Sequence, residues 1–232
     1  MNVVTETAKG RATRTRIVSA AAELIGGSSI AETSLDDVID RAGVSKGQLY
    51  HYFDDRDELL RAVVAHNANT VLAAQAPHLE SLDTWKAIRS WFDSLVELQI
   101  DRGARGGCPI GSLVGQLAES DERARCELEM SFERWQRHLC DGLRAMRARG
   151  ALSRRADPVR LATATMAALQ GGLLLTQVRR DPAQLAIALD AAYAHLRVHR
   201  PRAQSSEPVI GAARRAASRS APGLSRHHAS HR

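Results

Sequence analysis

The segment TSLDDVIDRAGVSKGQLYHYFDDR, residues 33–56, constrains this chain more than any other part of it. In its first half, apolar residues recur at helical spacing after a hydroxyl residue, Thr33 or Ser34, that can cap a helix. Gly43 follows, where a helix end commonly needs a positive φ. Ser45 can cap the next helix. The segment therefore predicts two short helices joined by a tight turn.

The second of these helices is expected to present small, polar and aromatic groups outward, while Leu49 and Phe53 anchor it from below. Its first two turns carry Lys46, Gly47, Gln48, Tyr50 and His51. A recognition helix reads the major groove of DNA through its N-terminal residues. Lysine suits guanine acceptors and glutamine suits adenine, so Lys46 and Gln48 are the expected base readers. Gly47 permits a close approach to the bases.

The longer run GVSKGQLYHYFDDRDELL resembles the recognition-helix signature of TetR-family transcriptional regulators. The features shared are a Gly-Val turn, a Leu-Tyr pair, an aromatic residue two positions on, and a basic residue before an acidic-Leu-Leu run. The match covers residues 10–62. The basic residue is Arg56 where lysine is commoner in the family, and Asp54 and Asp55 precede it. Arg56 keeps the charge that binds phosphate, although arginine and lysine differ in geometry.

The resemblance implies a sequence-specific DNA-binding regulator, most often a repressor that a small-molecule effector releases from a palindromic operator. Positions matching Ser34, Tyr50, Tyr52 and Arg56 contact backbone phosphate or thymine methyl groups in similar proteins. The full set of expected DNA-binding residues is Thr33, Ser34, Ser45, Lys46, Gly47, Gln48, Tyr50, His51, Tyr52 and Arg56.

The remaining pattern is helical throughout. Aromatic residues make up only 4% of the 232 residues and alanine and leucine are plentiful, which favours helix over strand. About nine helices are expected, near residues 13–25, 34–42, 46–53, 56–76, 82–101, 109–118, 121–148, 158 onward, and 182–198. Pro77 should end the fourth. The predicted class is all-α, with a helix-turn-helix domain over 1–56, an effector-binding and dimerisation domain over 57–200, and a basic disordered tail over 201–232.

The net charge does not locate the DNA-binding domain by itself. The stretch 200–232 holds seven arginines against one glutamate, which equals the whole net charge of +6. The position of the basic residues, rather than their number, must therefore identify the DNA-binding surface. One such placement is a basic cluster before and within the first helix, Lys9, Arg11, Arg14 and Arg16, which can contact phosphates. The tail could add a nonspecific attraction to DNA, or be a neutral extension.

The eighth and ninth helices predict a homodimer. The eighth is apolar on nearly every face, so it should be buried on several sides, and its small residues allow close backbone approach. In similar proteins the last two helices form a four-helix bundle with those of the symmetry mate. The alternative is burial within one subunit. A reader of two half-sites needs a two-fold axis, which favours the dimer.

The effector is expected between the fourth and eighth helices, in a region that could be lined by Trp85, Trp91, Phe92, Met130, Trp135 and Met166, although each could equally be ordinary core. Cys108 precedes Pro109 and should cap the sixth helix, where the helix dipole would lower the pKa of its thiol. A similar Gly-Cys segment occurs in TetR-like repressors that sense electrophiles. The alternative is a buried structural cysteine. Cys126 and Cys140 are interpreted as packing residues.

Other functional classes have weaker support. Three cysteines without CxxC spacing argue against a disulfide framework or a zinc site, and no cofactor or metal is expected. His66, His78 and His138 lack metal spacing, and no nucleophile-elbow, phosphate-loop or dinucleotide motif occurs. An enzyme is therefore not expected, although a Cys108–His138 pair stays open. No apolar run of about 18 residues and no signal peptide occur, which predicts a cytoplasmic protein without a membrane span.

Two rival classes of protein also stay open. One responds only to covalent modification of Cys108, acting as a redox or electrophile sensor. The other coats DNA nonspecifically through its tail.

Overall fold

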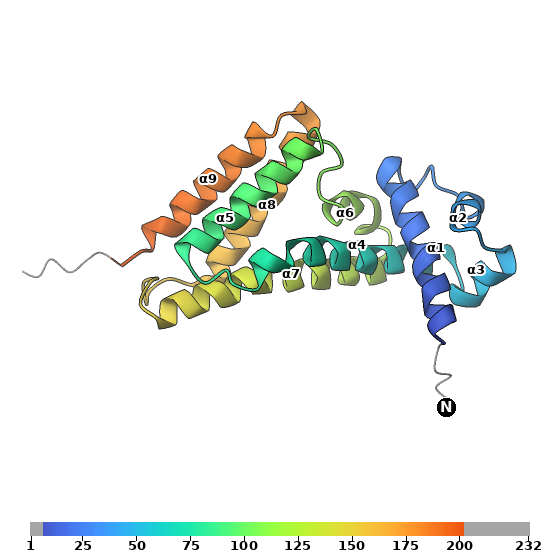
Figure 1. Cartoon of the computed structure of the whole chain (residues 1–232), viewed down its shortest axis with the longest axis horizontal. Coiled ribbons are helices and arrows are strands. Elements are labelled where there is room, and N and C mark those ends of the chain that lie inside the picture. The colour runs from blue at the N-terminus through green and yellow to red at the C-terminus, as the bar shows by residue number, and fades with distance from the viewer. Residues whose placement is uncertain (1–6, 202–232) are drawn as a thin grey trace, which may run out of the picture. The chain divides into compact units, whose positions relative to one another are not determined.

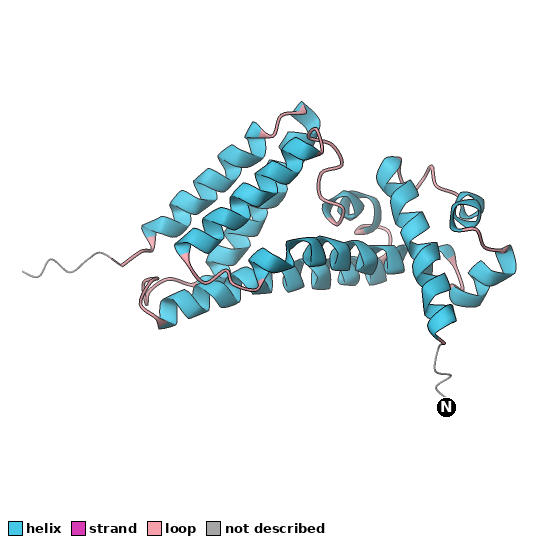
Figure 2. Ribbon diagram, in the orientation of Figure 1, coloured by secondary structure: helices cyan, strands magenta, loops and turns pink. Residues whose placement is uncertain are grey.

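Nine α-helices and no strand form among residues 7–201, the part of the chain that the computed structural model describes (Figures 1 and 2). This confirms the all-α prediction. The helices are α1 (Ala8–Gly27), α2 (Leu35–Ala42), α3 (Lys46–Tyr52), α4 (Arg56–Leu79), α5 (Trp85–Asp101), α6 (Gly111–Leu117), α7 (Glu122–Ala148), α8 (Pro158–Arg179) and α9 (Ala183–Val198). The predicted tail falls almost wholly on residues 202–232, outside the described residues, and the predicted domain boundary at residues 56/57 stays a prediction.

The first three helices form a small bundle in which α1 packs on α2 and α4, and α2 packs on α3. Its centre consists of fully buried side chains, among them Ile17, Ala21, Leu49 and Phe53. The predicted turn between α2 and α3 is confirmed, because Gly43 adopts the left-handed conformation at φ +62°. Its N–H donates to the carbonyls of Asp40 and Ile39, which closes the last turn of α2.

Helices α4 and α7 pack lengthwise against each other, and α4 also contacts α1 and α5 (Figure 1). The prediction that Pro77 ends α4 is wrong, because the helix continues to Leu79. Proline lacks the N–H that would bond to the carbonyl four residues earlier, but a helix loses only that one bond when proline lies in its last turn. Later groups still bond normally, since the N–H of Glu80 donates to the carbonyl of Ala76.

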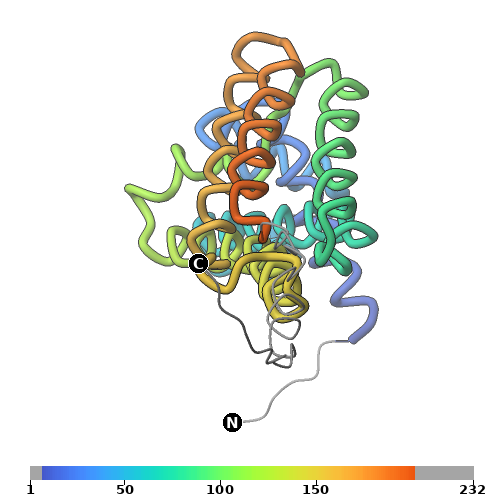
Figure 3. The backbone as a smooth tube through the Cα atoms, turned by 90° about the vertical axis from the view of Figure 1, so that its left-hand side faces the viewer, coloured from blue at the N-terminus to red at the C-terminus, as the bar shows by residue number. Residues whose placement is uncertain are grey.

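Helices α5, α8 and α9 lie side by side, with α9 contacting both of the others (Figure 3). The predicted start of α8 is confirmed, because the Asp157 side chain accepts from the N–H groups of Val159 and Arg160, and Pro158 opens the helix. Close approach between α8 and α9 depends on Gly172. A Cβ there would lie 2.9 Å from the side chains of both Leu185 and Ala188.

Helix α8 buries one side within the described fold and exposes the other, so its predicted burial on several sides stays a prediction. Leu161, Met166, Leu169 and Leu173 are buried, whereas Leu174 and Val178 are 62% and 72% exposed. By length and composition α8 alone among the described helices could cross a membrane, but core helices of soluble proteins pass the same test. Its buried side packs against α7 and α9 within the fold.

Two glycines, one at the end of α2 and one inside α6, provide opposite tests of the backbone conformation. Gly43→Ala should lower the free energy of unfolding by about 1 kcal/mol, because a Cβ is strained at positive φ. Gly115→Ala, inside α6 with open space around it, should raise the free energy of unfolding by roughly 0.5–1 kcal/mol through helix propensity. Urea denaturation measures both. Equal effects of the two substitutions would contradict the assigned backbone conformations.

Candidate nucleic-acid interface and effector cavity

Two reciprocal capping interactions fix the ends of the helix-turn-helix. The Ser34 hydroxyl accepts from the N–H of Asp37, and the Asp37 carboxylate accepts from the N–H of Ser34 at 2.9 Å. Ser45 and Gln48 form the same arrangement at the start of α3. The hydroxyl and the N–H of Ser34 together lower the pKa of the exposed Asp37 carboxyl. Sequence reasoning identified Ser34 and Ser45 as caps, and both assignments are confirmed.

The outer face of α3 is available to a partner. Lys46, Gly47, Gln48 and His51 are exposed, and Tyr50 is 45% exposed. Tyr52 is half-buried, with its ring edge-on to His51 at a centroid distance of 4.9 Å. Below this face, Leu49 and Phe53 are each 1% exposed and hold the helix on the bundle. The structure therefore brings together on one short helix most of the residues that the sequence singled out for DNA contact.

Gln48 has a second role that the sequence did not reveal. Its side-chain Oε1 accepts from the N–H of Ser45 at 2.9 Å, so the residue also stabilises the start of α3. A signal for this was present, because a Ser followed three residues later by Glu or Gln is the pattern of a capping box. A bidentate contact with adenine would require Oε1 to accept from the Ser45 N–H and from the base with its two lone pairs, whereas a single bond from Nε2 leaves the cap as it is.

Thr33 and Arg56 are tied into the loop between α1 and α2. Thr33 is 7% exposed, and its hydroxyl donates to the carbonyl of Ser29 at 2.8 Å. Arg56 Nη2 donates to the carbonyls of Ile30 and Thr33, the latter at 2.9 Å. Arg56 therefore links the start of α4 to this loop. The described residues engage only Nη2, so the phosphate contact expected of Arg56 would use its other N–H groups.

Two of the basic residues of α1 also make contacts within the bundle. Arg16 Nε donates to the carbonyl of Ala42 at 2.9 Å, which satisfies one free carbonyl at the end of α2. The guanidinium of Arg14 lies 5.1 Å from the centroid of the Phe53 ring. Both residues are nevertheless exposed, and so are Lys9 and Arg11. The four basic side chains therefore remain accessible to solvent around the first half of α1.

A cavity of about 230 Å³ lies in the second half of the fold. Side chains from α4, α5, α7 and α8 and the loop 107–109 line it: Thr70, Val71, Ala74, Gln75, His78, Ser94, Leu95, Leu98, Gln99, Arg102, Gly107, Cys108, Pro109, Trp135 and Leu173. A larger hollow of about 480 Å³ lies between α4 and α7, and its lining includes Glu80, Arg134 and Asp141. This hollow is a groove open to the surface. The smaller, mostly apolar cavity is the better candidate for a small ligand.

Two buried polar atoms at this cavity have no hydrogen-bond partner among the described residues, Gln99 Oε1 and Trp135 Nε1. Each residue is 2% exposed. A buried polar atom without a partner costs about 1–3 kcal/mol, so such an atom in a cavity wall suggests a ligand that completes it. Gln75 provides a contrast, because its Oε1 accepts from Trp91 Nε1 at 2.8 Å and its Nε2 donates to the carbonyl of Val71.

The sequence identified only part of this lining. Of the expected effector residues, Cys108 and Trp135 face the cavity. Trp91, Phe92 and Met166 lie in the hydrophobic core outside the cavity lining, and Trp85 packs against that core. Met130 is 49% exposed on α7. Gln99 was missed altogether. Its position on the apolar side of α5 was a possible signal, because a polar residue on a buried helix face needs a partner.

Cys108 corrects two expectations. It does not cap the sixth helix, because α6 begins at Gly111 and its N-cap position is Ile110. The Cys108 sulfur does accept from the N–H of Gly111 at 3.3 Å. The thiol pKa is nevertheless raised rather than lowered. Burial at 8% exposure has the largest effect, and it outweighs the bonds from Gly111, Ile110 and Gln170 that favour the thiolate.

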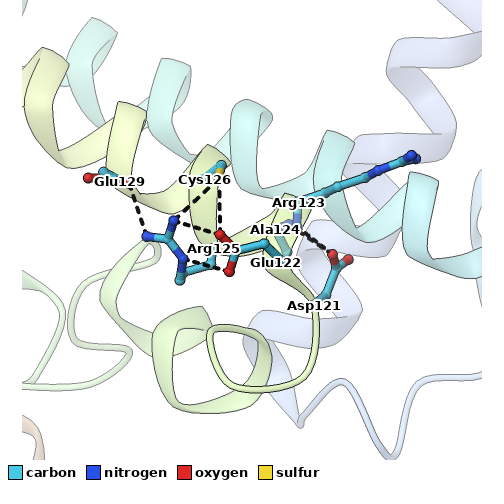
Figure 4. Close-up of polar contacts among 7 residues, drawn as sticks. All are labelled: Asp121, Glu122, Arg123, Ala124, Arg125, Cys126 and Glu129. Carbon is cyan, nitrogen blue, oxygen red and sulfur yellow. Dashed lines mark hydrogen bonds and ion pairs between the residues drawn. The ribbon is translucent and has the colours of Figure 1, made fainter.

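The other two cysteines differ in surroundings. Cys140 is 5% exposed, and burial raises the pKa of its thiol. Cys126 is half-buried near the start of α7, where Arg125 pairs with Glu122 and Glu129 (Figure 4). The sulfur of Cys126 lies 3.8 Å from Glu122 Oε1. Cys126 is therefore the most accessible of the three cysteines.

Thiol labelling tests this ordering. N-ethylmaleimide at pH 7 should modify Cys126 at least tenfold faster than Cys108 or Cys140, because burial blocks access and disfavours the reactive thiolate. Peptide mass mapping over time measures the three rates, with labelling in denaturant as the control for intrinsic reactivity. Faster modification of Cys108 than of Cys126 would restore the case for a reactive sensor thiol.

Catalytic and metal constellations receive no structural support within residues 7–201. No group of three or more histidine, cysteine, aspartate or glutamate side chains there could hold a metal ion. Cys108 faces the cavity, whereas His138 is exposed in the groove between α4 and α7. The structure therefore does not bring Cys108 and His138 into one site.

Two protein-family models match the chain, one in its N-terminal part and one in its C-terminal part. Residues 17–63 match the model for bacterial regulatory proteins of the tetR family, and residues 84–191 match the C-terminal domain of LmrA/YxaF-like transcriptional regulators. A helix-turn-helix regulator from the lacX 3′ region of Lactococcus lactis is 31% identical over 179 residues, covering 74% of this chain and 86% of that protein. The transcriptional regulator AcuR of Cereibacter sphaeroides is 26% identical over 72% of this chain and 78% of its own.

Solved structures share the fold. A TetR transcriptional regulator from Chloroflexus aurantiacus aligns with a TM-score of 0.71 at 24% identity, covering 85% of this chain and all of that one. The regulatory protein TetR from Rhodobacter sphaeroides aligns with a TM-score of 0.69 at 22% identity, covering 79% and 98%. Together with the exposed recognition helix and the cavity, these matches show that the chain belongs to the TetR family of DNA-binding, helix-turn-helix transcriptional regulators.

Proposed function

We propose that this regulator is a homodimeric, cytoplasmic repressor that binds a palindromic operator and is released from it by a small molecule in the cavity. It acts by binding alone, without enzymatic activity. The observation that carries the DNA-binding part is the exposed, doubly capped helix α3, with Lys46 and Gln48 in its first turn. Donors at the N-terminal end of a recognition helix reach the base edges of the major groove.

Substitutions at Gln48 separate base reading from helix capping. Gln48→Glu keeps a side-chain acceptor for the Ser45 N–H but loses the amide donor, whereas Gln48→Ala loses both. If Gln48 reads a base, both variants should lose about 1–3 kcal/mol of discrimination at one position in each half-site. Binding to operators mutated one base pair at a time, measured by fluorescence anisotropy at fixed salt concentration, gives these values.

The control for this experiment is the unfolding midpoint. Only Gln48→Ala should lower it, because only that variant loses the capping interaction. A uniform loss of affinity in Gln48→Glu, with unchanged preference at every base position, would show that Gln48 supports α3 without reading DNA.

The exposed apolar face of α8 and α9 supports the dimer. Along α8, exposed positions recur every three or four residues and include Ala164, Ala167, Gly171, Leu174 and Val178. On α9, Ile187 is 64% exposed. Small residues followed by larger ones suit a close crossing of two identical helices, and a large exposed apolar face marks an interaction surface. We therefore assign the two-fold contact to this face.

Charge on that face should separate the subunits. Leu174→Glu and Val178→Glu each bring two carboxylates near a two-fold axis and remove apolar contact. The free energy of dimerisation should therefore become less favourable by about 3 kcal/mol or more. Sedimentation velocity over a concentration series measures the dissociation constant. Met130→Glu, at an exposed apolar position on α7, is the matched control and should leave the dimer intact. Dimers that persist in all three variants would place the interface elsewhere.

A chain of contacts supports effector control of DNA binding. Cys108 and Pro109 line the cavity, and the carbonyl of Pro109 accepts from Asn67 Nδ2 of α4 at 3.1 Å. Directly after this loop comes α6, whose Gln116 Oε1 accepts from the backbone N–H of Ile30 at 2.9 Å. The carbonyl of Ile30 is held by Arg56 at the start of α4.

The backbone of Ile30 is therefore held by α6 through its N–H and by α4 through its carbonyl. Ile30 lies in the loop that leads into α2, so a displacement of α6 would act directly on the helix-turn-helix. A ligand that repositions loop 107–109 would thereby favour one arrangement of the DNA-binding helices over another. Such a ligand lowers operator affinity only as far as it binds the two arrangements with different affinity.

A further inference from the structure

Three buried side-chain atoms have no hydrogen-bond partner among the described residues. Two of them, Trp135 Nε1 and Gln99 Oε1, belong to side chains that line the cavity, and the third, Gln170 Nε2, belongs to a side chain outside its lining. Trp135 Nε1 can only donate a hydrogen bond, so its partner must be an acceptor. Gln99 Oε1 can only accept, so its partner must be an N–H or O–H group. Both atoms belong to side chains that are 2% exposed, on α7 and α5. A ligand that satisfies both carries an acceptor and a donor.

The charge of the lining narrows the ligand further. None of the described side chains that line the cavity is acidic, so a cation would be buried there without a counter-charge. A carboxylate could accept from Trp135, but its second oxygen has no proton to offer Gln99 Oε1. Arg102 is exposed, and a charge pair there is weakened by solvent. An uncharged ligand therefore fits the buried part of the cavity better than either ion.

The volume of the cavity limits the size of the ligand. At about 230 Å³ the cavity lies below the usual range for drug-sized ligands and has room for roughly eight water molecules. Apolar side chains such as Val71, Leu95 and Leu173 cover the rest of its wall. The ligand must therefore be small, with an apolar body and one compact polar group.

We propose that the effector is a small uncharged molecule with an apolar body and a carboxamide-like group, whose carbonyl accepts from Trp135 and whose N–H or O–H donates to Gln99. This inference rests on the proposed role of the cavity as the effector site. It names the ligand class for that site and adds Gln99 and Trp135 as the residues that determine specificity.

Three probes of nearly identical shape test the class. Benzamide has the acceptor and the donor, acetophenone has only the acceptor, and benzoate is an anion with two acceptors. Ligand-observed NMR titration gives the dissociation constant of each for the full-length protein. Benzamide should bind about five- to tenfold more tightly than acetophenone, as expected for one additional hydrogen bond, and more tightly than benzoate.

Two substitutions locate the binding mode. Trp135→Phe keeps an aromatic ring without the N–H donor and should weaken benzamide binding about five- to tenfold. Gln99→Met keeps the side-chain length without the acceptor and should make benzamide and acetophenone bind equally. Trp85→Phe is the matched control, because Trp85 lies outside the cavity against Tyr193, and it should change nothing. Thermal unfolding of each variant shows that the fold is retained.

The outcomes separate the ligand class from the proposed function. Tighter binding of benzoate would overturn the class, because the Gln99 amide would then present its NH₂ group to the cavity. No binding of any probe, or unchanged benzamide binding in both cavity variants, would also overturn it. Operator affinity is measured in parallel with benzamide at saturation. Selective benzamide binding with unchanged operator affinity would confirm the ligand class and contradict effector release.

Discussion

The described fold depends on one continuous helix, α4, which connects the DNA-binding bundle to the cavity. It spans 24 residues, which corresponds to a length of about 36 Å. At its first residue, Arg56 holds the loop before α2, and further along it packs against α1, α7 and α5 and lines the cavity. One continuous helix therefore carries both a wall of the cavity and the anchor of the loop that leads into α2.

Capping interactions give the DNA-binding bundle its local precision, and burial gives it stability. The helices α2 and α3 have only eight and seven residues, too short to be stable alone in water. Their ends are fixed by Ser34 with Asp37, by Ser45 with Gln48, and by Gly43. The side-chain amide of Gln48 has two roles, because it caps the start of α3 and lies on the face proposed to meet DNA.

The cavity wall contains buried polar atoms without hydrogen-bond partners among the described residues. Other buried polar groups in the core find partners, as Gln75 does with Trp91 and Thr176 does with the N–H of Leu185. Gln170 Nε2, outside the cavity lining, has none among the described residues. At the cavity wall, Gln99 Oε1 and Trp135 Nε1 have none either. Cys108 also lies in this wall, and its burial raises the pKa of the thiol.

The sequence by itself determined the helical class, the two caps of the helix-turn-helix, the positive φ at Gly43 and the start of α8, because each depends on the preferences of a few neighbouring residues. It also identified the family through a local motif. Only the tertiary structure decided the raised pKa of Cys108, the continuation of α4 past Pro77, the exposed face of α8 and the role of Gln99. Each of these depends on which segments, distant in sequence, remove a side chain from water, and no local pattern records that.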